Sequence, residues 1–247
     1  MTFRLPLPKN AKIQENLTAA ANPLRVAYNE IDASTVEMEI FTAIGADPLN
    51  GEGATAKGTT SFLGKNKGKN VNIRINSPGG LAFEGITIFN ALKDHDGHVT
   101  TTVEGIAASA AAIITMAGDT IRMQENAQFF IHRAHGFAMG NVDDFLDTAE
   151  FMNKLDDSIA LTMSKRSGVD LDTVKDLLKG KVDGTTLSAS EALEYGFIDE
   201  IVPLAEKGDN DEGEGDAGRG DRAGGAARAA AGGGRGGACA SHLLLRA

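Results

Sequence analysis

The chain has 247 residues and a single cysteine, Cys239, near its C-terminal end. One cysteine excludes an intrachain disulfide bond and any metal site built from several cysteines. A protein without disulfide bonds suits the reducing environment of the cytoplasm. We therefore expect a cytoplasmic protein.

Positive charge is also scarce. The sequence contains 24 lysines and arginines against 34 aspartates and glutamates, which gives a formal net charge of −10 at pH 7. Nucleic-acid binding needs clustered basic side chains that neutralise phosphates, and the sequence has no basic stripe of this kind. We expect no nucleic-acid partner.

Long apolar runs are missing as well. The longest covers residues 106–117, and it is too short and too rich in alanine to span a bilayer. The first six residues lack the apolar centre of a signal peptide. We expect no membrane association.

The composition predicts one main domain between two irregular ends. The chain is 42% hydrophobic and 23% charged, which is typical of a soluble globular protein. Residues 1–23 are polar and interrupted by prolines, and we expect a flexible arm there. Residues 204–247 are rich in glycine, alanine, arginine and aspartate, with few large apolar side chains. Such a segment buries too little surface to offset its ordering entropy, so we expect a disordered tail after a domain at 24–203.

Strand and helix patterns alternate along this domain. Residues 71–76 alternate apolar and polar side chains, whereas apolar residues recur at helical spacing over 83–92. Strands are predicted again at 99–103 and 127–131. Alternation of this kind predicts an α/β fold of layered, repeated strand-helix units.

The most informative segment surrounds Ser109. This lone serine stands among glycine and alanine residues where a strand gives way to a helix. Small neighbours permit a sharp turn, and a hydroxyl at a helix N-terminus faces the positive end of the helix dipole, which suits a nucleophile. The alternative is an alanine-rich core helix that the serine only caps.

Two other segments favour the catalytic interpretation. The strand at 71–76 runs into Ser77-Pro78-Gly79-Gly80, and paired glycines can present free backbone N–H groups to a substrate oxyanion. His132 follows the predicted strand 127–131, where an imidazole can act as a general base.

Together these segments resemble the ClpP family of serine peptidases, and most closely its bacteriophage branch, the head maturation (prohead) proteases. The resemblance covers about residues 24–203. Five blocks stand in family order: Ile75-Asn76-Ser77-Pro78-Gly79-Gly80, Gly105-Ile106-Ala107-Ala108-Ser109-Ala110, Ala117-Gly118, Ile131-His132 and residues 188–199. The resemblance implies the ClpP/crotonase-like version of the layered α/β fold.

The resemblance also assigns roles to residues. It implies that Ser109 is the nucleophile and that the N–H groups of Gly80 and Ala110 form the oxyanion hole. We prefer His132 to His135 as the base, because His135 is predicted to lie in the loop that follows. The remaining histidines are in a polar turn, where we expect them to be solvated, or in the tail: His95, His98 and His242.

The third member of the triad is irregular. In the family an acidic residue precedes the block that begins here at Thr185, and direct alignment places Gly184 at that position. Asp183 stands one residue earlier, and we hypothesise that a flexible Gly184 lets its carboxylate reach His132. The alternative is a solvated Asp183, with the Thr185 hydroxyl or a backbone carbonyl orienting the imidazole.

A long amphipathic helix is predicted after Asn141, which is followed by two aspartates in the manner of a helix N-cap. We expect most of its apolar stripe to be core. In ClpP-like proteins the corresponding helix helps the subunits associate, so part of the stripe is expected to serve assembly. The stripe consists of Val142, Phe145, Ala149, Met152, Leu155 and Ile159.

The function implied by the resemblance is that of an ATP-independent serine endopeptidase. It would cleave scaffold or capsid proteins during phage head maturation, in the host cytoplasm in association with the procapsid. The resemblance also implies a homo-oligomer, which we expect to be a ring. No metal or nucleotide cofactor is implied. Two alternatives stay open, namely a catalytically impaired ClpP-like capsid-assembly subunit and a crotonase-like acyl-CoA enzyme that holds a thioester enolate without a serine nucleophile.

Overall fold

A sheet of eight strands organises the chain in the computed structural model, which describes residues 26–46 and 53–204. The expected arm at 1–23 and nearly all of the expected tail lie outside the described residues. The elements in chain order are β1 (Val26–Glu30), β2 (Thr35–Ile40), α2 (Ala56–Lys65), β3 (Asn70–Ser77), α3 (Ala82–Lys93), β4 (Val99–Ala108), α4 (Ala110–Thr115), β5 (Thr120–Gln124), β6 (Gln128–Ile131), α5 (Val142–Ser167), α6 (Leu171–Lys179), β7 (Thr185–Ser188), α7 (Ala189–Glu194) and β8 (Glu200–Val202).

Most of the sheet is parallel. Its main path runs β1-β2-β3-β4-β5-β8, and only β1 is antiparallel to its neighbour on this path. Helices connect successive parallel strands, as such crossovers require. The predicted α/β layered fold is therefore confirmed.

Strand β4 serves two branches of the sheet. Its first half, Thr100–Val103, pairs with β5, and its last residues, Ile106–Ala108, pair with β6. Strand β6 in turn pairs with β7 in antiparallel orientation. The C-terminal end of β4 is thereby placed between the ends of β3 and β6.

An irregularity in β4 lies just before this end. Between the pairs Ile75–Val103 and Ser77–Ala107, two residue steps in β3 correspond to four in β4. The Asn76 side-chain oxygen accepts a hydrogen bond from the Ile106 N–H at 3.3 Å, which satisfies a group that the ladder leaves free. The asparagine of the Asn-Ser-Pro-Gly-Gly segment thus has a structural role beside the bulge.

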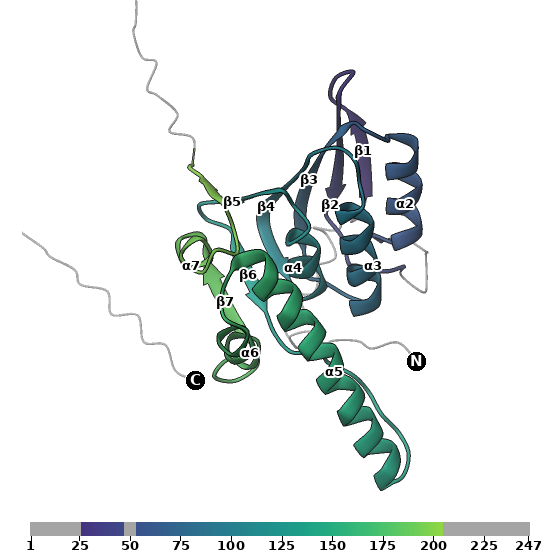
Figure 1. The fold of residues 1–247 in the computed structure, drawn as a ribbon, viewed down its shortest axis with the longest axis vertical. Helices are drawn as coiled ribbons and strands as arrows, with labels where there is room; N and C mark the ends of the chain where they lie inside the picture. Colours follow the sequence, from purple (N-terminus) through teal and green to yellow (C-terminus); the bar gives the residue numbers. More distant parts are fainter. Residues whose placement is uncertain (1–25, 47–52, 205–247) are drawn as a thin grey trace, which may run out of the picture. The chain divides into compact units, whose positions relative to one another are not determined.

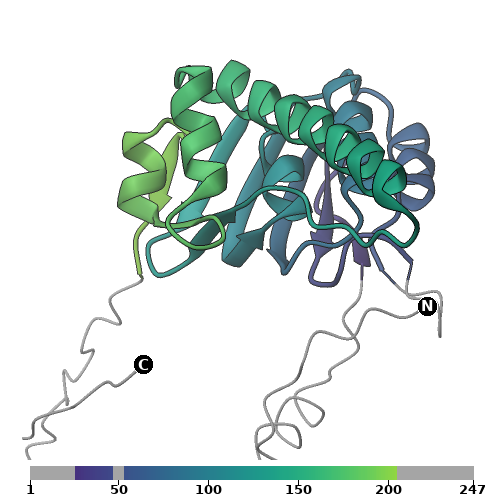
Figure 2. The same ribbon diagram turned by 90° about the horizontal axis from the view of Figure 1, so that it is seen from below.

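The helices α3, α4 and α5 cover the same face of the sheet (Figure 2). All six residues of α4 are buried, and they are alanine, isoleucine and threonine. Gly85 of α3 lies against the start of α4, since a Cβ at that glycine would stand only 3.0 Å from the Ala110 Cβ. Small side chains let the short helix pass close to its neighbours.

Helix α5 is buried only toward its C-terminal end. Asn141 caps it, with Asp144 completing a capping box as the aspartates after Asn141 suggested. Ile159, Ala160 and Met163 are buried. The first turns of the helix project past the sheet beside the 132–141 segment (Figure 1). The expectation that most of the apolar stripe is core is therefore wrong for its first half, where Val142 and Phe145 are exposed.

No helix among the described residues is long and apolar enough to cross a membrane.

The close contact between α3 and α4 predicts that valine substitutions at two glycines change the free energy of unfolding in opposite directions. We expect Gly85→Val to lower the free energy of unfolding by about 1–3 kcal/mol, because the added methyl groups meet Ala110 in a packed site. Gly64→Val in α2 is the matched control, since nothing lies within 4 Å of that position and valine is a better helix former than glycine. Urea denaturation of both variants measures the difference, and equal stabilities would contradict the packing argument.

Candidate active site

Ser109 occupies a strained turn between β4 and α4. Its backbone has φ 56° and ψ −121°, and it is the only non-glycine residue with positive φ in the part of the chain that the structure describes. Its N–H donates to the Phe130 carbonyl of β6 at 2.9 Å, which holds the turn. A backbone of this kind costs on the order of 1–3 kcal/mol and is found mainly at functional sites.

The Ser109 hydroxyl is not used as a helix cap. The residue stands at the N-cap position of α4, but its side chain makes no capping hydrogen bond. The residue is half-buried, so its Oγ is accessible. The purely capping interpretation is therefore wrong, and the hydroxyl is available for chemistry at the N-terminus of the helix.

The Gly79-Gly80 turn lies directly against Ser109. Gly79 has φ 89°, and a Cβ there would stand 2.7 Å from the Ser109 Cβ, so only glycine fits. Gly80 has φ 155° and is fixed by Ile44, whose N–H donates to the Gly79 carbonyl at 2.9 Å and whose carbonyl accepts from Leu81 N–H at 2.9 Å. Bonds on both sides of Gly80 set the direction of its own N–H.

Ser77 supports the Gly79-Gly80 turn through two hydrogen bonds of its hydroxyl. Its buried hydroxyl donates to the Thr42 carbonyl at 2.6 Å and accepts from the Gly79 N–H at 3.2 Å. The serine of the Ser-Pro-Gly-Gly turn is therefore a scaffold residue.

Two backbone donors beside Ser109 are free. Among the described residues, neither the Gly80 N–H nor the Ala110 N–H has a hydrogen-bond partner. The Ala110 N–H is one of the first groups of α4, which have no acceptor within the helix. Two free donors next to an accessible hydroxyl are the arrangement that an oxyanion hole needs.

His132 follows β6 and reaches the site through strand pairing. Ala108, the last residue of β4, pairs with Phe130 of β6. Ser109 directly follows Ala108 and His132 follows Phe130 by two residues, so both come just after the paired strand ends. The His132 ring stacks on Phe130, with centroids 5.1 Å apart and planes at 15°. Alternation along a strand puts residues two apart on one face, so this stacking was readable from the sequence.

One nitrogen of the His132 ring lacks a partner among the described residues. Its Nδ1 is buried and has no hydrogen-bond partner among the described residues, and no hydrogen bond joins the ring to Ser109 Oγ there. Burial lowers the pKa of His132 and the neighbouring His135 lowers it further, while the Asp183 carboxylate acts in the opposite direction. The net effect favours the neutral imidazole, which is the form a general base needs.

Asp183 lies near His132 but bonds to a different ring. Its Oδ1 lies 3.0 Å from Nε2 of His135, and both side chains are more than half exposed. A ring nitrogen of His132, a ring nitrogen of His135 and an Asp183 oxygen all lie within 4.8 Å of one another. The structure thus brings Asp183 to the site, but it does not show the predicted hydrogen bond to His132.

Gly184 explains why the acid is displaced by one position. It has φ 93°, and a Cβ there would stand 2.5 Å from the His132 Cβ and would also meet the Ile131 carbonyl. No aspartate fits this position without a backbone shift, although direct alignment with the family places an acid here. The Thr185 hydroxyl donates instead to the Leu177 carbonyl at 2.6 Å, so it does not hold the imidazole.

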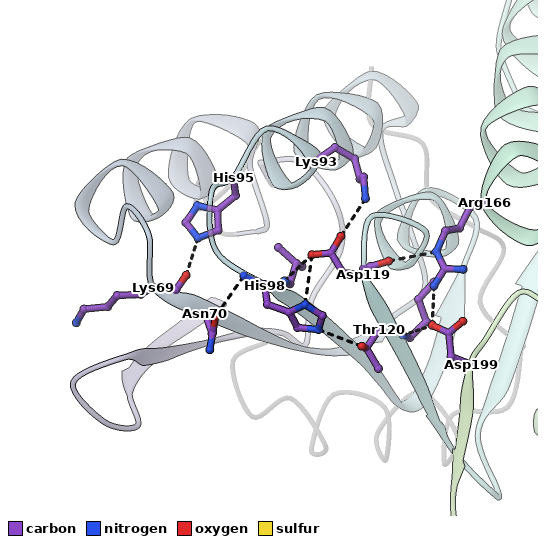
Figure 3. Close-up of polar contacts among 12 residues, drawn as sticks. Lys69, Asn70, Lys93, His95, His98, Asp119, Thr120, Arg166 and Asp199 are labelled. Atoms are coloured by element: carbon purple, nitrogen blue, oxygen red, sulfur yellow. Dashed lines mark hydrogen bonds and ion pairs between the residues drawn. The ribbon is translucent and has the colours of Figure 1, made fainter.

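The other described histidines belong to a separate polar network (Figure 3). They lie before the first residue of β4, whereas Ser109 follows its last residue. His95 is half-buried and its Nε2 is 2.8 Å from the Lys69 carbonyl oxygen, so the expectation of a solvated ring is wrong. His98 is exposed, and its Nε2 is 3.0 Å from Thr120 Oγ1.

A family model described as Clp protease matches residues 58–204, more than half of the chain. The chain belongs to the Clp protease family. The match includes each of the candidate site residues described above. The family assignment agrees with the resemblance found in the sequence.

Two curated relatives of this family member come from bacteria. It is 32% identical over 137 residues to an ATP-dependent Clp protease proteolytic subunit of Bacteroides thetaiotaomicron, and the match covers 55% of this chain and 61% of the relative. It is 34% identical over 138 residues to the subunit of Leuconostoc citreum, with coverages of 54% and 68%. The chain thus spans about three fifths to two thirds of the length of these relatives. The two comparisons show the family and not its bacteriophage branch.

The fold is also found among solved structures. A point mutant of ClpP1 from Listeria monocytogenes matches with a TM-score of 0.57 and 22% sequence identity, over 68% of this chain and 91% of that one. This likeness confirms the ClpP-like α/β fold.

The surroundings of His132 predict its titration. In metal-free buffer we expect a pKa below the ordinary value of about 6.5, because burial disfavours the imidazolium form. Asp183→Asn should lower the pKa further, and His135→Gln should raise it. Histidine NMR titration measures these shifts, with His98→Gln as a distant control. An unchanged pKa in Asp183→Asn would show that the carboxylate does not act on His132.

Proposed function

We propose that the chain is a serine endopeptidase with Ser109 as nucleophile. The observation that carries this proposal is the strained Ser109 turn, which holds an uncapped hydroxyl beside two N–H donors without a partner in the described part of the chain. His132 arrives at the same place on the adjacent strand. Membership of the Clp protease family supports the same chemistry.

The reaction follows from this arrangement. Neutral His132 accepts the Ser109 proton as Oγ attacks the carbonyl carbon of the scissile peptide. The Gly80 and Ala110 N–H groups donate to the resulting oxyanion, and His132 then returns the proton to the leaving amine. Water repeats the cycle on the acyl-enzyme. These steps use no ATP, metal or cofactor.

We assign Asp183 the third role in this mechanism. Its charge favours the protonated form of His132, which arises during the reaction. The Asp183 side chain is more than half exposed, so it is free to rotate toward the buried Nδ1 of His132. A hydrogen bond between the Asp183 carboxylate and Nδ1 of His132 would complete a Ser109–His132–Asp183 triad.

We further propose that the protein acts as a homo-oligomeric ring that cleaves scaffold and capsid proteins during phage head maturation. The resemblance of its motif blocks to the head maturation branch supports this substrate class. Exposed apolar residues before α5 and in its first half support assembly, since a patch of this kind is typical of an interface. These residues are Phe137, Met139, Val142, Phe145, Leu146 and Phe151.

A substitution that places one charge on the apolar face of α5 tests whether the subunits assemble through this helix. We expect Phe145→Glu to shift the protein to smaller species in multi-angle light scattering, because the carboxylate would be buried in an apolar contact. Glu150→Gln, an exposed change on the same helix, should leave the size unchanged. A wild-type protein that is both monomeric and fully active would contradict the ring.

The nucleophile is tested by Ser109→Ala. We expect loss of fluorophosphonate labelling and of peptide cleavage by several powers of ten, with the fold retained because the change removes only one oxygen. Wild-type protein co-expressed with the scaffold and capsid proteins should yield cleaved products by mass spectrometry, and the variant should yield none. Unlabelled wild-type protein that still assembles would favour the catalytically impaired capsid-assembly subunit.

A further inference from the structure

Two histidines and one aspartate converge beside the candidate site. His132 and His135 are three residues apart on the segment after β6, and Asp183 comes from the loop between α6 and β7. One nitrogen from each ring and one carboxylate oxygen all lie within 4.8 Å of one another. Two imidazoles and a carboxylate are a common ligand set for catalytic-type zinc sites, which leave a fourth position for water.

The backbone holds the two segments together independently of these side chains. Ile131 pairs with Thr185 between β6 and β7, and the Arg133 N–H donates to the Leu178 carbonyl at 3.1 Å. The Ala134 N–H donates to Asp156 of α5 at 2.7 Å. Gly184 packs against His132 so closely that a larger residue does not fit. The three ligands are therefore carried on a fixed frame.

The spacing fits a small ion after minor side-chain movement. Bonds of about 2.0–2.1 Å in tetrahedral geometry put ligand atoms about 3.3 Å apart. His135 and Asp183 are already 3.0 Å apart, and both are exposed enough to rotate. His132 Nδ1 has no other partner among the described residues.

We propose that His132, His135 and Asp183 form a binding site for a divalent transition-metal ion of the zinc type, and that the bound ion inhibits the peptidase. Imidazole ligands select such ions over Mg²⁺ and Ca²⁺, which prefer oxygen. The inhibition, unlike the binding, rests on the proposed function.

Inhibition follows because a neutral imidazole has only one nitrogen that can accept a proton. A neutral imidazole has one nitrogen with a free lone pair, and the other nitrogen carries the hydrogen. When the lone pair binds a metal ion, neither nitrogen can accept the Ser109 proton. This holds whichever nitrogen of His132 binds. The same ion would also occupy the Asp183 carboxylate that the triad requires.

Metal binding is measured first, without any need for activity. The full-length Ser109→Ala protein, with Cys239→Ser and His242→Gln to remove tail ligands, is titrated with Co²⁺ by visible absorption and then with Zn²⁺ by calorimetry. We expect one ion per chain. His135→Gln and Asp183→Asn should each weaken binding at least about tenfold, whereas His98→Gln should not. Absence of binding, or equal binding by His135→Gln, would overturn the site.

Inhibition is measured by the rate at which fluorophosphonate labels Ser109 at about pH 8, above the usual imidazole titration. Zn²⁺ should slow labelling of the wild type and a chelator should restore it. The labelling rate is compared with and without Zn²⁺ within each protein, and His135→Gln should be at least about tenfold less sensitive to Zn²⁺ than the wild type, whatever its rate without the ion. Equal sensitivity would overturn inhibition through this site. A protein that binds Co²⁺ but never reacts would confirm the site and refute both the proposed function and the inhibition.

Discussion

The division of β4 between two partner strands is the constraint on which the candidate site depends. Its first half extends the main sheet through β5, and its last three residues turn to β6. This division puts Ser109 and His132 at the ends of adjacent strands, and Ser109 N–H bonds to a β6 carbonyl. If β4 paired with β5 along its whole length, its C-terminal end would not pair with β6. Ser109 would then not lie beside the segment that carries His132. The main-chain ladder, rather than any side-chain contact, brings Ser109 and the segment that carries His132 together.

Small residues convert this proximity into a usable site. Gly79 and Ala110 flank Ser109 so closely that a Cβ on Gly79 would lie 3.0 Å from the Ala110 nitrogen. Strain at Ser109 is stabilised by the surrounding hydrogen bonds of Ser77, Ile44 and Phe130, which fix both turns. In the proposed mechanism, a backbone fixed in this way would hold the Gly80 and Ala110 N–H groups in place without reorganisation during the reaction. The same closeness explains why the segment is so poor in large side chains.

The features that were predictable from sequence are the local ones. Ser109 at a strand-helix junction, the Gly79-Gly80 turn and His132 after a strand follow from residue types at short spacing, and each was found where the pattern placed it. The partner of Asp183 was not predictable. It depends on the positive φ of Gly184 and on how the loop before β7 meets the segment after β6, which no periodicity encodes.

The apolar stripe of α5 was misjudged for a related reason. Helical periodicity shows that Val142 and Phe145 share a face with Ile159, but it does not show how far the sheet extends beneath the helix. In the structure the sheet supports only the second half, where Ile159 and Met163 are buried. An amphipathic pattern identifies a face that must be covered. It does not distinguish cover by the same chain from cover by another one.

The position of Asp183 is set by a balance of small energies. Its pairing with exposed His135 is worth about 0–1 kcal/mol, because water screens both groups. The buried Nδ1 of His132, which has no partner within residues 26–46 and 53–204, costs about 1–3 kcal/mol by the usual measure of an unsatisfied polar group. The carboxylate therefore loses little by leaving His135, and it gains more by pairing with the buried Nδ1 of His132.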